Sequence, residues 1–313
     1  MKDIKLRSFP DKNYKAVFIR STSMTIRLLH DVNSDIPMSE LDFPEFYDIK
    51  LTGKCEGKCP WCYMSSMPDN NHYEVVSNLL KLFGPMTQNQ RPFQIAYGGG
   101  EPTLHPDFEE ILRTTKNLDI VPNFTTNGDQ SNITAKVLQT VEECSDGVAI
   151  SCHPHLVKQW KRALQIYAEL ANTKINFHII ISTPESVDYF INIYKFYKGL
   201  IDYFVLLKFS PIGRAATMPF QEEIEQEATR KLFSFLKSHK EVIGTLSDIA
   251  FGAHYYPDLA KEENASIGAS IYQPNMFSKY IDMKDMTIYS NSFETKPIDN
   301  VFEFFRTKGI CYD

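Results

Sequence analysis

Apolar residues recur along the chain in short runs, and segments with helical spacing separate these runs. Six runs rich in β-branched and aromatic residues predict strands, at 47–52, 93–97, 120–125, 147–151, 175–182 and 203–209. The clearest helical pattern lies at 155–171, where apolar residues follow the 3.6-residue period and Pro154 stands at the first turn. A second helix is predicted at 222–240, with glutamates in its first turn and lysines near its end.

Regular alternation of strands and helices predicts parallel strands joined by right-handed crossovers. Six strand–helix repeats are too few to close an eight-stranded barrel. We therefore predict an α/β fold built on a splayed, partial (β/α)6 barrel of the TIM type. Functional residues of such folds gather at the C-terminal ends of the strands, so we expect the chemistry in the loops that follow them.

Two segments flank the predicted barrel. Residues 14–19 and 24–29 predict a small β-hairpin. It is either an edge that recognises a substrate or leader segment, or a lid that closes the bottom or side of the barrel. The lid is favoured because the stretch is short. Beyond the barrel, 278–283 and 286–290 predict another hairpin. The predicted organisation is an N-terminal hairpin extension at 1–44, the barrel at 45–240 and an irregular α+β C-terminal extension at 241–313.

Composition narrows the class of protein. The chain has 313 residues, of which 43% are hydrophobic and 13% aromatic, which is enough for a sizeable core. The formal net charge is −6 and no long basic run occurs, which argues against nucleic acid as a partner. The first residues lack the apolar stretch of a signal peptide, and no run has membrane-spanning length, so we expect a soluble, cytoplasmic protein. Six cysteines in such a chain favour metal binding or free thiols over disulfides.

Three of these cysteines form the strongest local signal. Cys55, Cys59 and Cys62 have the spacing C-x3-C-x2-C and come just after the first predicted strand. Structural zinc sites and iron–sulfur clusters usually have four protein ligands, so three thiolates leave a coordination position open for a substrate or cofactor. From the cysteines alone, a zinc knuckle that borrows a distant His stays an alternative.

A second motif bears on the choice between a zinc knuckle and a metal centre with an open coordination position. Gly98-Gly99-Gly100-Glu101-Pro102-Thr103 follows the second predicted strand. Together with the cysteine spacing and Trp61 before the third cysteine, it resembles the signature of the radical S-adenosylmethionine (radical SAM) superfamily. The resemblance extends to Thr125-Thr126-Asn127-Gly128 after the third strand. It also includes Ser-Pro-Ile-Gly-Arg-Ala at 210–215, which is similar to a P-x-GRA pattern of the peptide-modifying, SPASM/twitch-type branch. It covers about residues 45–215 and implies the same partial barrel.

This resemblance implies a role for each matching residue. Cys55, Cys59 and Cys62 are expected to bind three irons of one 4Fe–4S cluster, and S-adenosylmethionine to chelate the fourth. Electron transfer into the sulfonium then yields a 5′-deoxyadenosyl radical, which abstracts hydrogen from a substrate. The expected contacts with S-adenosylmethionine come from Trp61 and Tyr63 at the adenine, Gly99, Gly100 and Glu101 at the methionine ammonium, Asn127 and Ser151 at the ribose or carboxylate, and Arg214 at the carboxylate. A turn role for Asn127 and a structural salt bridge for Arg214 are the alternatives.

The C-terminal extension departs from the branch that the chain resembles. Many of those enzymes hold auxiliary clusters there with several cysteines. Here Ser290 and Ser292 stand where a ligand cysteine might be expected, and the extension has Cys311 as its one cysteine. We therefore predict a single cluster.

Three functional hypotheses follow. The first is a radical SAM oxidoreductase that modifies a side chain of a peptide or protein, as a maturase of ribosomal peptides does. The second is a radical SAM enzyme that acts on a nucleotide or another small metabolite. The third is a non-catalytic metal-binding protein. For an enzyme, a reductant such as flavodoxin or ferredoxin is the expected protein partner.

Overall fold

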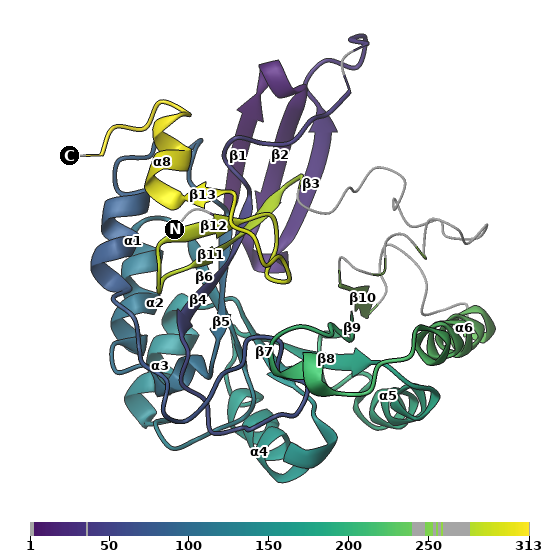
Figure 1. Cartoon of the computed structure of the whole chain (residues 1–313). Coiled ribbons are helices and arrows are strands. Elements are labelled where there is room, and N and C mark those ends of the chain that lie inside the picture. Colours follow the sequence, from purple (N-terminus) through teal and green to yellow (C-terminus); the bar gives the residue numbers. More distant parts are fainter. Residues whose placement is uncertain are drawn as a thin grey trace.

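The computed structural model describes residues 3–35, 37–239, 248–252, 255, 258 and 276–312. These residues form a three-stranded antiparallel sheet and a ten-stranded, mostly parallel sheet. Figure 1 shows helices along the outer side of the larger, curved sheet and the three-stranded sheet at one end of it. The predicted α/β class is confirmed.

The six predicted strands are all present, with ends that differ by no more than two residues. They are β4 (Phe46–Thr52), β5 (Gln94–Gly99), β6 (Val121–Thr126), β7 (Gly147–Ser151), β8 (Lys174–Ile181) and β9 (Tyr203–Lys208). Each pairs in parallel with the next. The helices between and after them are α1 (Val76–Phe83), α2 (Phe108–Asn117), α3 (Ala135–Cys144), α4 (Val157–Tyr167), α5 (Pro184–Tyr197) and α6 (Glu222–Ser238). The two helices predicted individually are α4 and α6, both shorter than expected.

The sheet continues beyond the predicted six strands on both sides. Strand β10 (Ile249–Phe251) joins β9 in parallel, and β11 (Ser278–Asp282) joins β4 in parallel. The predicted C-terminal hairpin is confirmed, since β11 pairs antiparallel with β12 (Thr287–Tyr289). Strand β13 (Asp299–Asn300) and helix α8 (Val301–Arg306) complete this end. Within the described residues the strand order runs from β10 to β13 without closing, as in a partial barrel.

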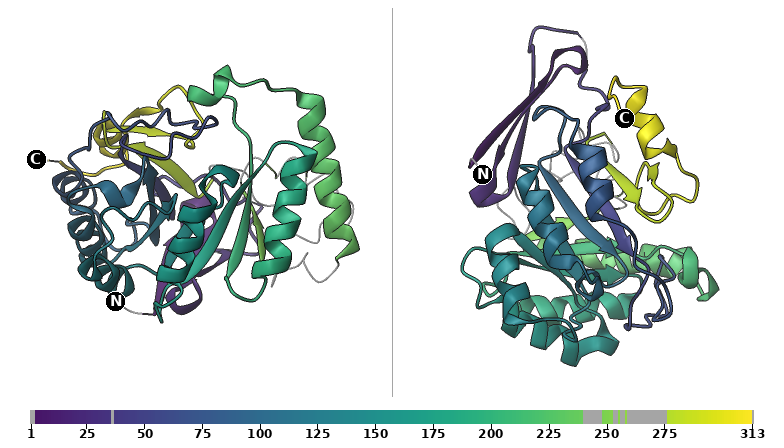
Figure 2. Two further views of the ribbon diagram at one scale, coloured as in Figure 1. Left: turned by 90° about the horizontal axis from the view of Figure 1, so that it is seen from below. Right: turned by 90° about the vertical axis from the view of Figure 1, so that its left-hand side faces the viewer.

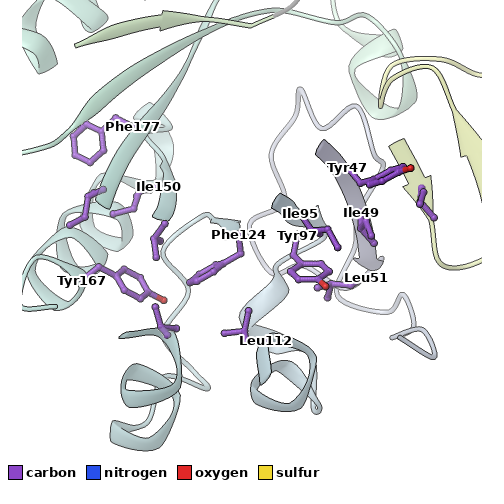
Figure 3. Packing of buried hydrophobic residues seen from close by; sticks show 14 of the residues in the cluster. Tyr47, Ile49, Leu51, Ile95, Tyr97, Leu112, Phe124, Ile150, Tyr167 and Phe177 are labelled. Atoms are coloured by element: carbon purple, nitrogen blue, oxygen red, sulfur yellow. The ribbon is translucent and has the colours of Figure 1, made fainter. Parts of the chain in front are cut away.

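Alternate residues of the strands face opposite sides of the sheet. Tyr47, Ile49 and Leu51 of β4 are fully buried in the core, together with Leu79 and Leu82 of α1. Figure 3 shows such core residues from several strands and helices. Removing each of these side chains from water contributes roughly 1.5–3 kcal/mol. The intervening residues Phe46, Asp48 and Lys50 are only half-buried and face the concave side of the sheet.

The N-terminal sheet consists of β1 (Ile4–Phe9), β2 (Tyr14–Ile19) and β3 (Met24–Leu29). The predicted hairpin is β2–β3, and β1 is an additional strand. Tyr14 and Phe18 pack with Phe93 and Val121, which lie at the N-terminal ends of β5 and β6. The sheet is also tied there by ion pairs of 2.9 Å, Arg20 with Asp146 and Arg27 with Glu45. It therefore covers the end of the barrel opposite the cysteine loop, as the lid interpretation predicted. Figure 2 gives two further views of its position.

No helix in the described ranges is both long and apolar enough to cross a membrane.

Candidate functional site

The sequence-predicted residues gather at the C-terminal ends of the parallel strands. The loop of the three cysteines follows β4, Gly99 ends β5, Asn127 follows β6 and Ser151 ends β7. Arg214 lies in a 3-10 turn (Gly213–Thr217) beyond β9. One edge of the sheet thus carries the motifs from five separate segments.

The three cysteines are free and half-buried. Backbone N–H groups donate to their sulfurs, from Gly57 to Cys55 Sγ at 3.4 Å and from Ser66 to Cys62 Sγ at 3.4 Å. Burial, with repulsion from neighbouring thiolates, raises the pKa of Cys55 to about 11 and that of Cys59 to about 12. The sulfurs are therefore close enough to act on one another. A cationic metal centre that displaces their protons removes this repulsion.

Three thiols in one short loop are the donors that an iron–sulfur cluster takes. In an iron–sulfur cluster each thiolate binds its own iron. Cys55, Cys59 and Cys62 thus fit the group that the family resemblance implies.

The glycine motif is joined directly to the start of the cysteine loop. The Gly100 N–H donates to the Thr52 carbonyl at 2.7 Å, and the Glu101 N–H donates to the Lys54 carbonyl at 2.8 Å. A Cβ on Gly100 would lie 2.1 Å from the Lys54 carbonyl oxygen, and Gly99 has a φ of +100°. Both positions need glycine because of this backbone contact. Their approach to the methionine ammonium stays a prediction.

Glu101 joins two of the strand ends. Its side chain is 1% exposed, and its carboxylate accepts hydrogen bonds from the Thr103 hydroxyl at 2.8 Å and the Asn127 N–H at 2.7 Å. Burial raises its pKa to about 7. Its observed contacts hold the segment after β5 to the segment after β6. The expected position of this carboxylate near the methionine ammonium stays a prediction.

The buried Glu101 predicts that the free energy of unfolding falls as the pH rises. Its pKa is raised from 4.5, so the protonated group favours folding at low pH, and this contribution is lost as the pH passes 7. Between about pH 4 and pH 8, the free energy of unfolding of the Glu101→Gln variant should fall by up to roughly 3 kcal/mol less than that of the wild type. Urea unfolding of the cluster-free proteins measures this difference. If the free energy of unfolding fell by the same amount in both proteins, this would contradict the assignment of the raised pKa to Glu101.

Asn127 has two contacts that fix its side chain. Its Oδ1 accepts from the Asp129 N–H at 2.8 Å, which confirms the turn role. Its Nδ2 donates to Cys55 Sγ at 3.2 Å. Donors to ligand sulfurs tune a cluster's reduction potential. No pattern in the sequence indicated this contact with the sulfur. A contact of Asn127 with the ribose or carboxylate of the cofactor stays a prediction.

Arg214 holds the cysteine loop by its backbone. Its Nε donates to the Cys59 carbonyl at 2.8 Å, its Nη1 to the Ser66 carbonyl at 3.0 Å, and its N–H to the Cys62 carbonyl at 3.1 Å. Gly213, with a φ of +58°, lies so close that a Cβ would be 2.2 Å from the Tyr63 carbonyl oxygen. Within the described residues the guanidinium binds carbonyl groups rather than the carboxylate of the salt bridge that we considered. Its contact with the cofactor carboxylate stays a prediction.

The two aromatic residues of the cysteine loop have different neighbours. Trp61 makes edge contacts with His153 and His155, at ring-centre distances of 5.5 and 4.9 Å. Tyr63 packs on Phe293, with 4.8 Å between the ring centres. The C-terminal extension therefore supports the cysteine loop, a contact that sequence reasoning missed.

Ser151 lies half-buried at the end of β7, and its carbonyl accepts from the His153 N–H at 3.0 Å. The segment that follows it is joined to the cysteine loop by the contacts of His153 and His155 with Trp61. The adenine contacts of Trp61 and Tyr63 and the ribose contact of Ser151 stay predictions.

Comparison with solved structures shows where this fold occurs. The crystal structure of Streptococcus suis SuiB bound to precursor peptide SuiA has a TM-score of 0.68 and 14% identity, and the match covers 96% of this chain and 85% of that one. SuiB bound to S-adenosylmethionine has a TM-score of 0.69, 13% identity and coverage of 100% and 88%. The structure of anSMEcpe with bound AdoMet and the Cp18Cys peptide has a TM-score of 0.58, 16% identity and coverage of 84% and 80%.

Comparison with family models agrees with the sequence motifs. Residues 49–197 match the model of the radical SAM superfamily. A search of curated proteins gave no match. The family implies a 4Fe–4S cluster and S-adenosylmethionine as cofactors, and the cysteine loop described above has the donors to hold the cluster. The chain therefore contains, at residues 49–197, a domain that matches the radical SAM superfamily.

Proposed function

We propose that this enzyme cleaves S-adenosylmethionine reductively and abstracts hydrogen from a side chain of a peptide or protein. The observation that carries the proposal is the cysteine loop, which is fixed from two sides. On one side the Gly100 and Glu101 backbone binds Thr52 and Lys54. On the other side Arg214 binds Cys59, Cys62 and Ser66.

The residues of the site would have different roles in this reaction. Cys55, Cys59 and Cys62 would hold three irons, and their cluster, with S-adenosylmethionine as its further ligand, supplies the electron that breaks the carbon–sulfur bond. Asn127 donates to the Cys55 sulfur and balances its charge. Glu101 and Arg214 keep the loop in place. A rigid loop matters because a radical reaction needs its reacting atoms held in a fixed orientation.

Two features favour a peptide over a small metabolite. SuiB and anSMEcpe, which share the fold, have both been crystallised with peptides. The Gly213–Arg214 segment, which resembles the pattern of peptide-modifying enzymes, is in direct contact with the cysteine loop. These features support a peptide as the class of substrate, and they do not specify the amino-acid sequence of that peptide.

Turnover of S-adenosylmethionine tests the first half of the proposal. Anaerobically reconstituted protein with dithionite should release 5′-deoxyadenosine and methionine, and a Cys59→Ser variant should release neither. A wild-type protein that binds a cluster but leaves S-adenosylmethionine intact would favour the non-catalytic alternative.

A substrate screen tests the second half. Release of 5′-deoxyadenosine should rise with short peptides encoded near the gene for this chain, and a mass change should appear in the peptide. Nucleotides and other small metabolites serve as the comparison set. Stimulation by a member of that set, with no response to peptides, would favour the small-metabolite alternative.

In the cell the electron must come from a protein partner, for which we propose flavodoxin or ferredoxin. All six cysteines are free in the structure, which suits a reducing compartment. We therefore propose a cytoplasmic location.

A further inference from the structure

Asp48 is an acidic residue inside the sheet that none of the motifs explains. It lies in the middle of β4 and faces the concave side, half-buried. Its in-register neighbours are Ala96 on β5 and Tyr280 on β11. Ala96 carries only a methyl group, so space beside the carboxyl is not filled from that strand.

The next concave position on the same two strands carries an ion pair, which Asp48 does not have among the described residues. Lys50 of β4 stands opposite Asp282 of β11, and the two side chains form an ion pair of 2.9 Å. Two residues earlier, the partner opposite Asp48 is the uncharged Tyr280, whose hydroxyl donates to the Met64 sulfur at 3.6 Å. One carboxylate on this face is thus neutralised by a lysine of the chain and the other is not.

No hydrogen bond or ion pair to the Asp48 carboxyl is found among the described residues. Burial alone raises its pKa, to about 7. On β8, whose half-buried residues include His178, burial alone lowers the pKa of that imidazole to about 4, so it is neutral near pH 7. The Oδ1 of Asn176, on the same strand, is buried and has no donor in the part of the chain described. Among the described residues the concave face therefore has hydrogen-bond acceptors that are not matched by a cation of the chain, since Lys50 is paired with Asp282.

The position of Asp48 connects it to the cysteine loop. Tyr280, which stands opposite Asp48, donates its hydroxyl to the sulfur of Met64, two residues after Cys62, at 3.6 Å. The carboxyl is therefore next to a side chain that contacts the cysteine loop. A group bound by Asp48 would be held beneath the edge of the sheet where the radical is expected to form.

We propose that Asp48 binds a cationic side chain, lysine or arginine, of the peptide substrate. The proposal rests on the function proposed above, and it adds the substrate class. An unpaired buried carboxylate is costly, and a cation with N–H donors compensates it. A divalent metal is a poorer occupant because Ca²⁺ and Mg²⁺ require several oxygen ligands, whereas a single carboxylate stands here.

Three matched probes test the proposal in the reconstituted holoenzyme. They are the capped tripeptides Ac-Gly-Lys-Gly-NH2, Ac-Gly-Arg-Gly-NH2 and Ac-Gly-norleucine-Gly-NH2, the last being an uncharged analogue of the lysine peptide. Titration by saturation-transfer NMR should show that the wild type binds the two basic peptides at least about 10-fold tighter than the norleucine peptide, as expected for a charge-assisted hydrogen bond. Asp48→Asn should abolish this preference and Asp48→Glu should keep it. Asp285→Asn, which removes an exposed acid from the turn between β11 and β12, should leave it unchanged.

Thermal melting is the check that Asp48→Asn folds, and the variant should melt above the wild type at pH 8 because it removes an unpaired charge from a half-buried position. Equal binding of all three peptides to the wild type would overturn the proposal, and so would a preference for basic peptides that survives in Asp48→Asn. Release of 5′-deoxyadenosine by the same wild-type preparation reports separately on the proposed function. An enzyme that cleaves S-adenosylmethionine without any preference for basic peptides would refute the inference alone.

Discussion

Replacing Gly100 with alanine is expected to displace the cysteine loop and to prevent most cluster assembly. The added methyl group would lie 2.1 Å from the Lys54 carbonyl oxygen, where a real contact needs more than 3 Å. The backbone of β5 must then move away, and the hydrogen bonds from Gly100 to Thr52 and from Glu101 to Lys54 are strained or lost. Overpacking of this kind costs about 1–3 kcal/mol, which lowers the melting temperature by roughly 3–8 °C. Bound iron should fall to a small fraction of the wild-type content.

Gly98, two residues earlier in β5, provides a matched control. A Cβ there would meet nothing within 4 Å, so Gly98→Ala should keep the wild-type iron content and melting temperature. Iron analysis and calorimetry of the two variants, prepared together, show whether the added methyl group at Gly100 prevents cluster assembly. If Gly100→Ala assembled as much cluster as Gly98→Ala, the close approach of β5 to the loop would not be required.

Replacing Arg214 with lysine is expected to loosen the cysteine loop even in the absence of S-adenosylmethionine. The guanidinium donates to the carbonyl groups of Cys59 and Ser66 at once, which a single ammonium group cannot reproduce in the same geometry. Hydrogen bonds that involve a charged group contribute about 1.5–3 kcal/mol each. Amide hydrogens in residues 59–66 should therefore exchange about 100-fold faster in Arg214→Lys, as hydrogen exchange with mass spectrometry would show.

This measurement separates the two roles of Arg214. If its main role were to bind the methionine carboxylate, Arg214→Lys would weaken S-adenosylmethionine binding while exchange in 59–66 stayed at the wild-type rate. Arg162→Lys is the control, because Arg162 is exposed and makes a 3.5 Å hydrogen bond to Gln165, away from the cysteine loop. It should change neither quantity.

The local pattern of the sequence was sufficient for the parallel part of the fold. Each strand from β4 to β9 is a run of apolar residues bounded by polar loops, and such runs can be recognised from the sequence alone. Strand β11 is different. Its place beside β4 depends on pairing between segments at opposite ends of the chain, such as Ile281 with Ile49, and no local pattern encodes that partner. The same applies to β1, whose partner strand β2 could be predicted but whose own apolar pattern was not singled out.

For the site, the sequence located the residues better than it assigned their contacts. Cys55, Glu101 and Asn127 do lie together, because motifs at the ends of the adjacent strands β4, β5 and β6 must meet at one edge. Arg214, which follows the more distant β9, reaches the same loop through its hydrogen bond to Cys59. Their contacts with one another were missed, since we assigned each of them to the cofactor. The structure shows that Glu101 and Asn127 are bonded to each other and that Asn127 reaches the Cys55 sulfur. Asp48 went unnoticed because a single acid within a strand carries no motif.

The central claim is that Cys55, Cys59 and Cys62 hold one iron–sulfur cluster that cleaves S-adenosylmethionine. The most direct test is iron and sulfide analysis of the anaerobically reconstituted protein, combined with electron paramagnetic resonance of the reduced form with and without S-adenosylmethionine. We predict about four irons per chain and a spectrum that changes when S-adenosylmethionine is added, with both features lost when the three cysteines are replaced by serine. Bound zinc in place of iron, about eight irons per chain, or a spectrum indifferent to S-adenosylmethionine would contradict the account.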